Sequence, residues 1–225
     1  MLKFTMPENP FATLPPVKVI KTKGKFIPID FSIGNKTLED LNTAADFEKY
    51  VESHLAKNNA TVAFGGYDEE RNLYKRSGIF NDSDTEERNI HIGTDLWIKA
   101  GTPVLAALDG KVHSFNYNSG IGNYGPTIIL EHKISGFAFY TLYGHLSMES
   151  IENLETGDEF KSGEPLATLG DAAVNGDYAP HLHFQVIKNI GDYSGDYPGV
   201  CSKNERNYYL ENCPDPNQLL KLNQP

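Results

Sequence analysis

From about residue 90 onward, short apolar runs alternate with turn signals, the pattern of a domain built from short strands. Turns recur at intervals of roughly ten residues, which is typical of antiparallel all-β architecture. The Asp109-Gly110 and Ser135-Gly136 pairs each lie between two apolar runs and predict hairpins. The predicted strands are 103–108 and 111–115 around the first turn, 127–132 and 137–143 around the second, and then 166–169 and 181–187.

The first 60 residues have a different pattern. Prolines interrupt residues 1–30, which indicates an extended arm or edge strands. Apolar positions at helical spacing then predict one amphipathic helix, or two short ones, within 38–57. The segment 37–40 (Thr-Leu-Glu-Asp) resembles a capping box at its start. His54 belongs to this helix, and we expect it at the surface or the rim of the protein.

Three regions follow from these patterns. Residues 65–88 are polar and contain glycine, so we expect a long loop whose charged run at 82–88 faces solvent. The last 30 or so residues hold turns and two cysteines, Cys201 and Cys213, which we expect as structural thiols or one local disulfide. The predicted organisation is an N-terminal arm and helix packing on the core (1–65), a β domain (66–200) and a C-terminal wrap (201–225).

Charge and hydropathy narrow the classes of function. The 225-residue chain has 20 Lys+Arg against 30 Asp+Glu, a net charge of −10. This balance argues against nucleic acid as a partner, because binding phosphates needs a basic surface. No segment approaches the roughly 20 apolar residues of a membrane span, so we expect no membrane insertion. The N-terminus lacks a signal-peptide pattern, which predicts a cytoplasmic location, or a periplasmic or secreted one if the sequence is trimmed.

Two short motifs carry candidate chemistry: His91-Ile-Gly-Thr-Asp95 and His181-Leu-His183. In a strand, residues i and i+2 lie on one face, so His181 and His183 can face one cleft. Two imidazoles and a carboxylate suit Zn²⁺, and a three-ligand site leaves a fourth position for a water whose pKa the metal lowers to about 7. The same donors form the facial triad of non-haem iron oxygenases, but that class usually has a tighter His-x-Asp motif.

A third motif, Tyr143-Gly-His145-Leu, completes a set that resembles the lysostaphin-type (LytM-like) zinc metallopeptidases. The stretches 102–106, 109–112, 122–125 and 128–132 resemble the same family, and the similarity covers about residues 85–190. It implies a mainly β fold, an antiparallel β-sheet or barrel-like sandwich of the duplicated hybrid motif kind, with a small helical N-terminal extension. The resemblance would make residues 66–200 a zinc metallopeptidase domain.

The resemblance also implies a role for each matching residue. His91, Asp95 and His183 would bind one Zn²⁺ ion. His181 would stay off the metal and act as general base or orient the water. His145 would polarise or protonate the scissile amide as the oxyanion forms. The usual substrate of the family is the peptide part of peptidoglycan, so a peptide or peptidoglycan-derived substrate is the expected partner.

Two features concern residues around this set. Some family members have a tyrosine about six residues before the first ligand, where it would stabilise the transition state. Position 85 is Thr here. Tyr67 and Tyr74 are candidates for this role. An equally good alternative is that both tyrosines only pack within a loop. His113 and His132 are expected to be structural, the latter through a hydrogen bond of the kind that supports a metal site.

Other stretches are similar to metallopeptidase-like modules in large fusion proteins that also carry kinase-like and aminotransferase domains; they are 125–132, 180–185, 196–200 and 212–217.

The predicted function is a zinc metalloendopeptidase that hydrolyses a peptide or amide bond, in peptidoglycan stem or crosslink peptides, with a metal-activated water. One alternative is an intracellular zinc amide hydrolase with a small peptide-like substrate, which suits the acidic charge. A non-catalytic binding or regulatory module of the same fold is the other, and the sequence indicates no oligomeric state.

Overall fold

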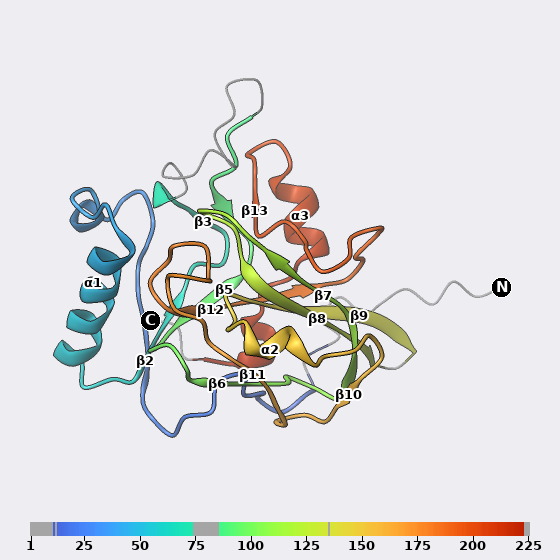
Figure 1. The fold of residues 1–225 in the computed structure, drawn as a ribbon. Coiled ribbons are helices and arrows are strands. Elements are labelled where there is room, and N and C mark those ends of the chain that lie inside the picture. The colour runs from blue at the N-terminus through green and yellow to red at the C-terminus, as the bar shows by residue number, and fades with distance from the viewer. Residues whose placement is uncertain (1–10, 12, 74–85, 135, 223–225) are drawn as a thin grey trace.

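The computed structural model describes residues 11, 13–73, 86–134 and 136–222, and eight of its strands form one large sheet (Figure 1). The order of strands in this sheet is β1-β2-β5-β12-β9-β8-β7-β10. Neighbours pair antiparallel except β1 and β2, which are parallel. The predicted mainly β fold is therefore confirmed. The strands are β1 (Phe26–Pro28), β2 (Val62–Gly65), β5 (Thr94–Trp97), β7 (Gly110–Asn118), β8 (Gly125–Ile134), β9 (Phe137–Gly144), β10 (Glu159–Phe160) and β12 (His181–Ile187).

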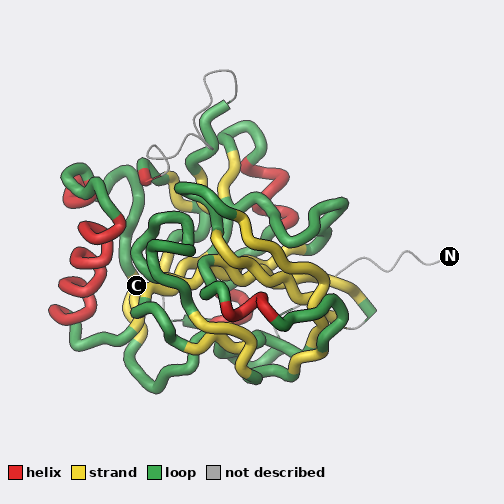
Figure 2. The backbone as a smooth tube through the Cα atoms, in the orientation of Figure 1, coloured by secondary structure: helices red, strands yellow, loops and turns green. Residues whose placement is uncertain are grey.

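Two smaller sheets accompany the large one in the described part of the chain, and Figure 2 colours all strands yellow. One pairs β6 (Pro103–Leu105) with β11 (Pro165–Thr168). The other has β4 (Ile90–His91) between β3 (Glu69–Glu70) and β13 (Val200–Cys201). This three-stranded sheet matters for function because it joins the predicted loop 65–88, the first candidate motif and the C-terminal part of the chain.

The second predicted hairpin forms, but the first prediction is wrong. Strands β8 and β9 pair from Ile128↔Tyr143 to Ile134↔Phe137, as the pattern predicts. The strands on either side of Asp109-Gly110 instead belong to different sheets, since β6 pairs with β11 and β7 pairs with β8 and β10. The Asp109 carboxylate accepts hydrogen bonds from Ser162 N and Lys161 Nζ. The turn at Asp109 therefore contacts residues 161 and 162 and does not close a hairpin.

The predicted N-terminal helix is α1 (Ala44–Lys57), which lies beside β2 at one edge of the molecule (Figure 1). Its capping box is formed by Thr43 and Asp46, not by the segment 37–40. Thr37 lies inside the 3-10 helix η1 (Lys36–Leu38), which the Asn35 side chain caps. The remaining helices are α2 (Glu149–Glu152), α3 (Arg206–Asn212) and α4 (Asn217–Leu220). Over the described ranges, none of the helices has the length and apolarity that crossing a bilayer requires.

Strand β12 lies at the centre of the hydrophobic core. All seven of its residues are buried, and it pairs with β5 on one side and β9 on the other. Leu182, Phe184 and Val186 pack into the largest apolar cluster. A second cluster joins α1 to the sheet through Phe31, Phe47, Val51 and Trp97, so the N-terminal part packs directly against the strands that carry the motifs. The domain boundaries at 65/66 and 200/201 remain a prediction.

Candidate metal centre

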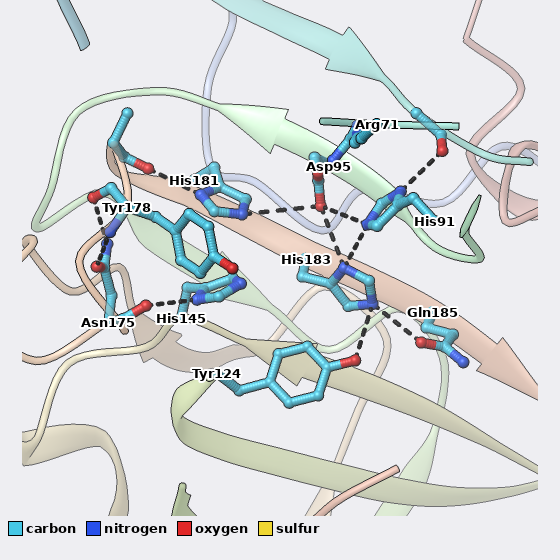
Figure 3. A network of polar contacts seen from close by, with 12 residues as sticks. Arg71, His91, Asp95, Tyr124, His145, Asn175, Tyr178, His181, His183 and Gln185 are labelled. Carbon is cyan, nitrogen blue, oxygen red and sulfur yellow. Dashed lines mark hydrogen bonds and ion pairs between the residues drawn. The ribbon is translucent and has the colours of Figure 1, made fainter. Parts of the chain in front are cut away.

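The candidate motifs converge because their strands are neighbours. In the antiparallel register of β5 and β12, Asp95 lies opposite His183 and Trp97 lies opposite His181. The alternation of β12 sends the histidines to the face opposite Leu182 and Phe184. His91 arrives from β4, whose register with β13 sets it opposite Val200. Strand pairing thus brings the residues of two distant motifs into one buried group (Figure 3).

His91, Asp95 and His183 form a compact group of three possible metal ligands. His91 Nε2 lies 2.9 Å from His183 Nδ1 and 3.3 Å from Asp95 Oδ1, and His183 Nδ1 lies 3.2 Å from the same oxygen. With bonds of about 2.0–2.1 Å, the edges of a zinc tetrahedron measure about 3.3 Å. The three separations therefore fit one face of a zinc tetrahedron.

Hydrogen bonds fix which atoms of the two histidines face this centre (Figure 3). His91 Nδ1 lies 2.7 Å from the Gly66 carbonyl, so this nitrogen carries the hydrogen and Nε2 keeps its lone pair. His183 Nε2 lies 2.9 Å from Gln185 Oε1, which leaves the lone pair of His183 on Nδ1. Metal-binding histidines in proteins are commonly oriented in this way.

Electrostatics keep His91 and Asp95 in the protonation states that a metal needs. Burial lowers the pKa of His91 to about 4, so its imidazole is neutral at pH 7. Burial alone would raise the pKa of Asp95, but the neighbouring His91 and Arg71 outweigh it and hold that pKa well below its usual range. At neutral pH the centre offers a carboxylate and a neutral imidazole with no proton to displace.

His145 and His181 form a second pair beside the first group, with ring centroids 4.2 Å apart (Figure 3). His145 Nδ1 donates to Asn175 O at 2.7 Å, and His181 Nδ1 donates to Ala179 O at 2.8 Å. Each ring therefore keeps an unprotonated Nε2, and that of His181 lies 3.8 Å from Asp95 Oδ1. Burial holds the pKa of His145 well below its usual range and also lowers that of His181.

His145 has a strained backbone, with φ of +63°. Its N–H donates to Tyr124 O at 2.9 Å, and its carbonyl accepts from Gly170 N at 3.0 Å. The surrounding loops thus hold a conformation that is costly for a residue with a Cβ, a feature often found at functional sites.

The structure adds several residues that the sequence motifs did not single out; they are Arg71, Tyr124, Asn175, Tyr178 and Gln185. Gln185 could have been found, because it continues the alternation of His181 and His183 on the same face of β12. Tyr124 lies in a loop, and its hydroxyl is 3.4 Å from His183 Nε2. Arg71 lies in the polar region 65–88, where no pattern distinguishes it.

The other candidates lie apart from this centre. The Tyr67 hydroxyl donates to Cys213 O at 2.8 Å, while Tyr74 and Thr85 fall outside the described residues. His132 is buried and bonds Asp109 O and Thr141 Oγ1, as expected for a structural histidine. His113 bonds the neighbouring Ser114 hydroxyl and His54 bonds the Pro28 carbonyl. Cys201 and Cys213 are buried free thiols, so no disulfide links them.

A cavity of about 290 Å³ opens beside the histidines. Its lining includes Phe31 and Phe47 from the N-terminal part and Leu73, which follows β3. Tyr193 and Tyr197 line another part of its wall, from the segment that follows β12. The histidine pair and the three possible metal ligands also line this cavity.

Comparison with known proteins gives consistent matches to one group. Residues 89–194 match the model of the family described as "Peptidase family M23". An uncharacterized metalloprotease of Haemophilus influenzae is 30% identical over 137 residues, which are 58% of this chain and 27% of that protein. Peptidoglycan DD-endopeptidase ShyC of Vibrio cholerae is 35% identical over 106 residues, 47% of this chain and 22% of that protein.

The chain spans about a quarter of the length of these two relatives. Among solved structures, the catalytic domain of the antimicrobial peptidase lysostaphin from Staphylococcus simulans aligns with a TM-score of 0.38 and 29% identity. That alignment covers 54% of this chain and 80% of the lysostaphin domain.

Proposed function

We propose that the protein is a lysostaphin-type zinc metallopeptidase, because residues 89–194 match the model of peptidase family M23 and contain the motifs from which the sequence predicted this family. It would hydrolyse a peptide bond, and the proposed substrate class is the stem or crosslink peptide of peptidoglycan. The Vibrio cholerae relative is a peptidoglycan DD-endopeptidase by name, which supports this class.

One observation carries the proposal. Three donor atoms, on His91, Asp95 and His183, lie 2.9–3.3 Å apart, and both imidazoles have their hydrogens tied to other oxygens. Two nitrogens and one carboxylate oxygen with no protons between them suit a divalent cation such as Zn²⁺. A bound zinc would supply Lewis acidity and a water of lowered pKa.

The two histidines beside this group are suited to proton transfer. Both His181 and His145 are neutral at pH 7 by the direction of their pKa shifts, and each presents Nε2 as an acceptor. We assign His181, which lies closer to the ligand group, the removal of a proton from the attacking water. We assign His145 the other side of the scissile amide. The proton that His181 takes from the water would pass to His145, whose ring lies 4.2 Å away, and His145 would then polarise the carbonyl or protonate the leaving nitrogen.

Tyr124 is our candidate for the role that a tyrosine before the first ligand has in some relatives. Its hydroxyl lies 3.4 Å from His183 Nε2, and its ring lies 5.5 Å from that of His145. A hydroxyl can accept one hydrogen bond and donate another, so Tyr124 can donate to a developing oxyanion.

A small peptide-like amide is the second candidate substrate. The net charge of −10 disfavours attraction to an anionic cell wall and has no such effect on a small neutral substrate. Both substrates use the same centre, so the distinction between them depends on the cavity and its rim.

Digestion of purified peptidoglycan and of a panel of small peptide amides, with mass analysis of the products, tests the proposal. We expect zinc-dependent release of peptide fragments by the wild type. His183→Ala should lose both bound zinc and hydrolysis, and His145→Ala should keep zinc but lose hydrolysis. A zinc-loaded wild type that cleaves neither substrate would indicate a non-catalytic module of the same fold.

A further inference from the structure

Arg71 is a fully buried arginine in direct contact with a proposed metal ligand. Its guanidinium Nη1 donates to Asp95 Oδ2 at 2.6 Å, and only 2% of the residue is exposed. Arg71 lies outside residues 89–194, just after β3, where its backbone N–H donates to Asn89 O at 2.8 Å. The contact therefore comes from a part of the chain that the family match does not include.

Several contacts hold the guanidinium in this place. Its Nε donates to Glu69 Oε2 at 2.6 Å, and the other oxygen of Glu69 accepts from Phe31 N at 3.2 Å. The rings of Phe31 and Trp97 lie 5.6 and 5.5 Å from the guanidinium carbon. A buried positive charge that bonds both Glu69 and Asp95 and lies between two rings has little freedom to move away from Asp95.

The contact gives the two oxygens of Asp95 different environments. Oδ2 is held by Arg71, whereas Oδ1 lies within 3.3 Å of the ligand nitrogens of His91 and His183. A carboxylate can bind a metal through one oxygen or through both, and the second mode fills a coordination position that a catalytic site leaves to water and substrate.

We propose that Arg71 is a positioning residue that holds Asp95 by Oδ2 and so restricts it to metal binding through Oδ1 alone. The inference rests on the proposed zinc site, and it adds to that site a residue that precedes the family match at 89–194. The same short segment also orients a second ligand, since Gly66 O accepts the hydrogen of His91 Nδ1. Residues 66–71 thus support two of the three ligands.

The test uses the full chain loaded with Co²⁺ in place of zinc, because visible absorption of Co²⁺ is several-fold stronger in four-coordinate than in five-coordinate sites. We expect the wild type and Arg71→Lys to give the intense four-coordinate spectrum. Arg71→Gln should give a several-fold weaker spectrum, since the released Oδ2 can then bind the metal. The matched control is Arg206→Gln, which removes an exposed arginine–aspartate pair with Asp68 and should keep the wild-type spectrum.

The outcomes separate this inference from the proposed function. A wild type that binds no Co²⁺ overturns both. If the wild type binds Co²⁺ and folded Arg71→Gln gives the same spectrum, only the role of Arg71 is wrong. Should Arg71→Gln not fold, X-ray absorption or a crystal structure of the zinc-loaded wild type decides instead. We expect one Asp95 oxygen on the metal, and two would overturn the inference.

Discussion

His91 Nε2 and His183 Nδ1 lie 2.9 Å apart, although the other nitrogen of each ring already donates its hydrogen to an oxygen. Two lone pairs therefore face each other, with Asp95 Oδ1 beside them. This arrangement is unfavourable unless a cation or a proton lies between the rings. Neighbouring residues maintain this arrangement through the hydrogen bonds of the two rings.

Gln185 should control zinc affinity through His183. Gln185→Leu removes the acceptor that keeps the His183 hydrogen on Nε2, and we expect zinc affinity to fall roughly 10- to 100-fold. Competition with a chromogenic chelator measures this change. The matched variant Gln185→Glu keeps an acceptor oxygen and should stay within a few-fold of the wild type. Equal affinity of the leucine variant and the wild type would show that the tautomer of His183 is set by another contact.

Gly66→Ala should disturb the metal centre indirectly, by displacing the side chains of Arg71 and His91. The added Cβ would lie 1.9 Å from Arg71 Nη2 and 3.0 Å from His91 Nδ1, at a residue with φ of +98°. We expect weaker zinc binding, by about tenfold or more, because both contacts support ligands. Gly101→Ala is the control, since it has a φ of +75° and nothing within 4 Å of the added Cβ.

Gly101→Ala should be less stable by about 1–2 kcal/mol, because alanine at positive φ is strained, and it should keep the wild-type zinc affinity. Chemical denaturation and zinc titration of both variants separate these effects. Equal zinc affinity in the two alanine variants would contradict a role for the segment 66–71 in the centre.

Acid should destabilise the metal-free protein in a defined range. The folded-state pKa values of His91, His132, His145 and His181 are all lowered, with His91 at about 4, whereas an unfolded histidine titrates near 6.5. Between these values the unfolded chain binds more protons, so stability falls as pH decreases from about 6.5 toward 4. The urea midpoint of chelator-treated protein at pH 7.5 and pH 5 measures this. An unchanged or higher midpoint at pH 5 would mean that these imidazoles are not neutral in the folded state.

The sequence predicts the ligand strand well because the relevant signal is local. The strand expected at 181–187 is β12 itself, and its alternation alone puts His181 and His183 on one face. The partner of this strand is not a local property. No pattern in the sequence states that Asp95 lies opposite His183, and this register is what brings the proposed metal ligands together.

Non-local contacts also explain the errors. The segments 37–40 and 43–46 share the pattern Thr-x-x-Asp, and only the second caps α1, because packing against the sheet decides where the helix begins. Likewise, Asp109-Gly110 has good turn chemistry, but β6 finds its partner in β11 rather than in β7. Arg71 and Tyr124 reach the centre through loops, so neither periodicity nor spacing indicates their positions.

Zinc stoichiometry of the purified full chain tests the central claim most directly. Equilibrium dialysis followed by elemental analysis should give one zinc per wild-type chain and per chain of His113→Ala, a histidine outside the centre. His183→Ala should bind substantially less than one zinc at the same free metal concentration. A wild type without bound zinc, or a His183→Ala variant that binds as much as the wild type, would contradict the proposed metal centre.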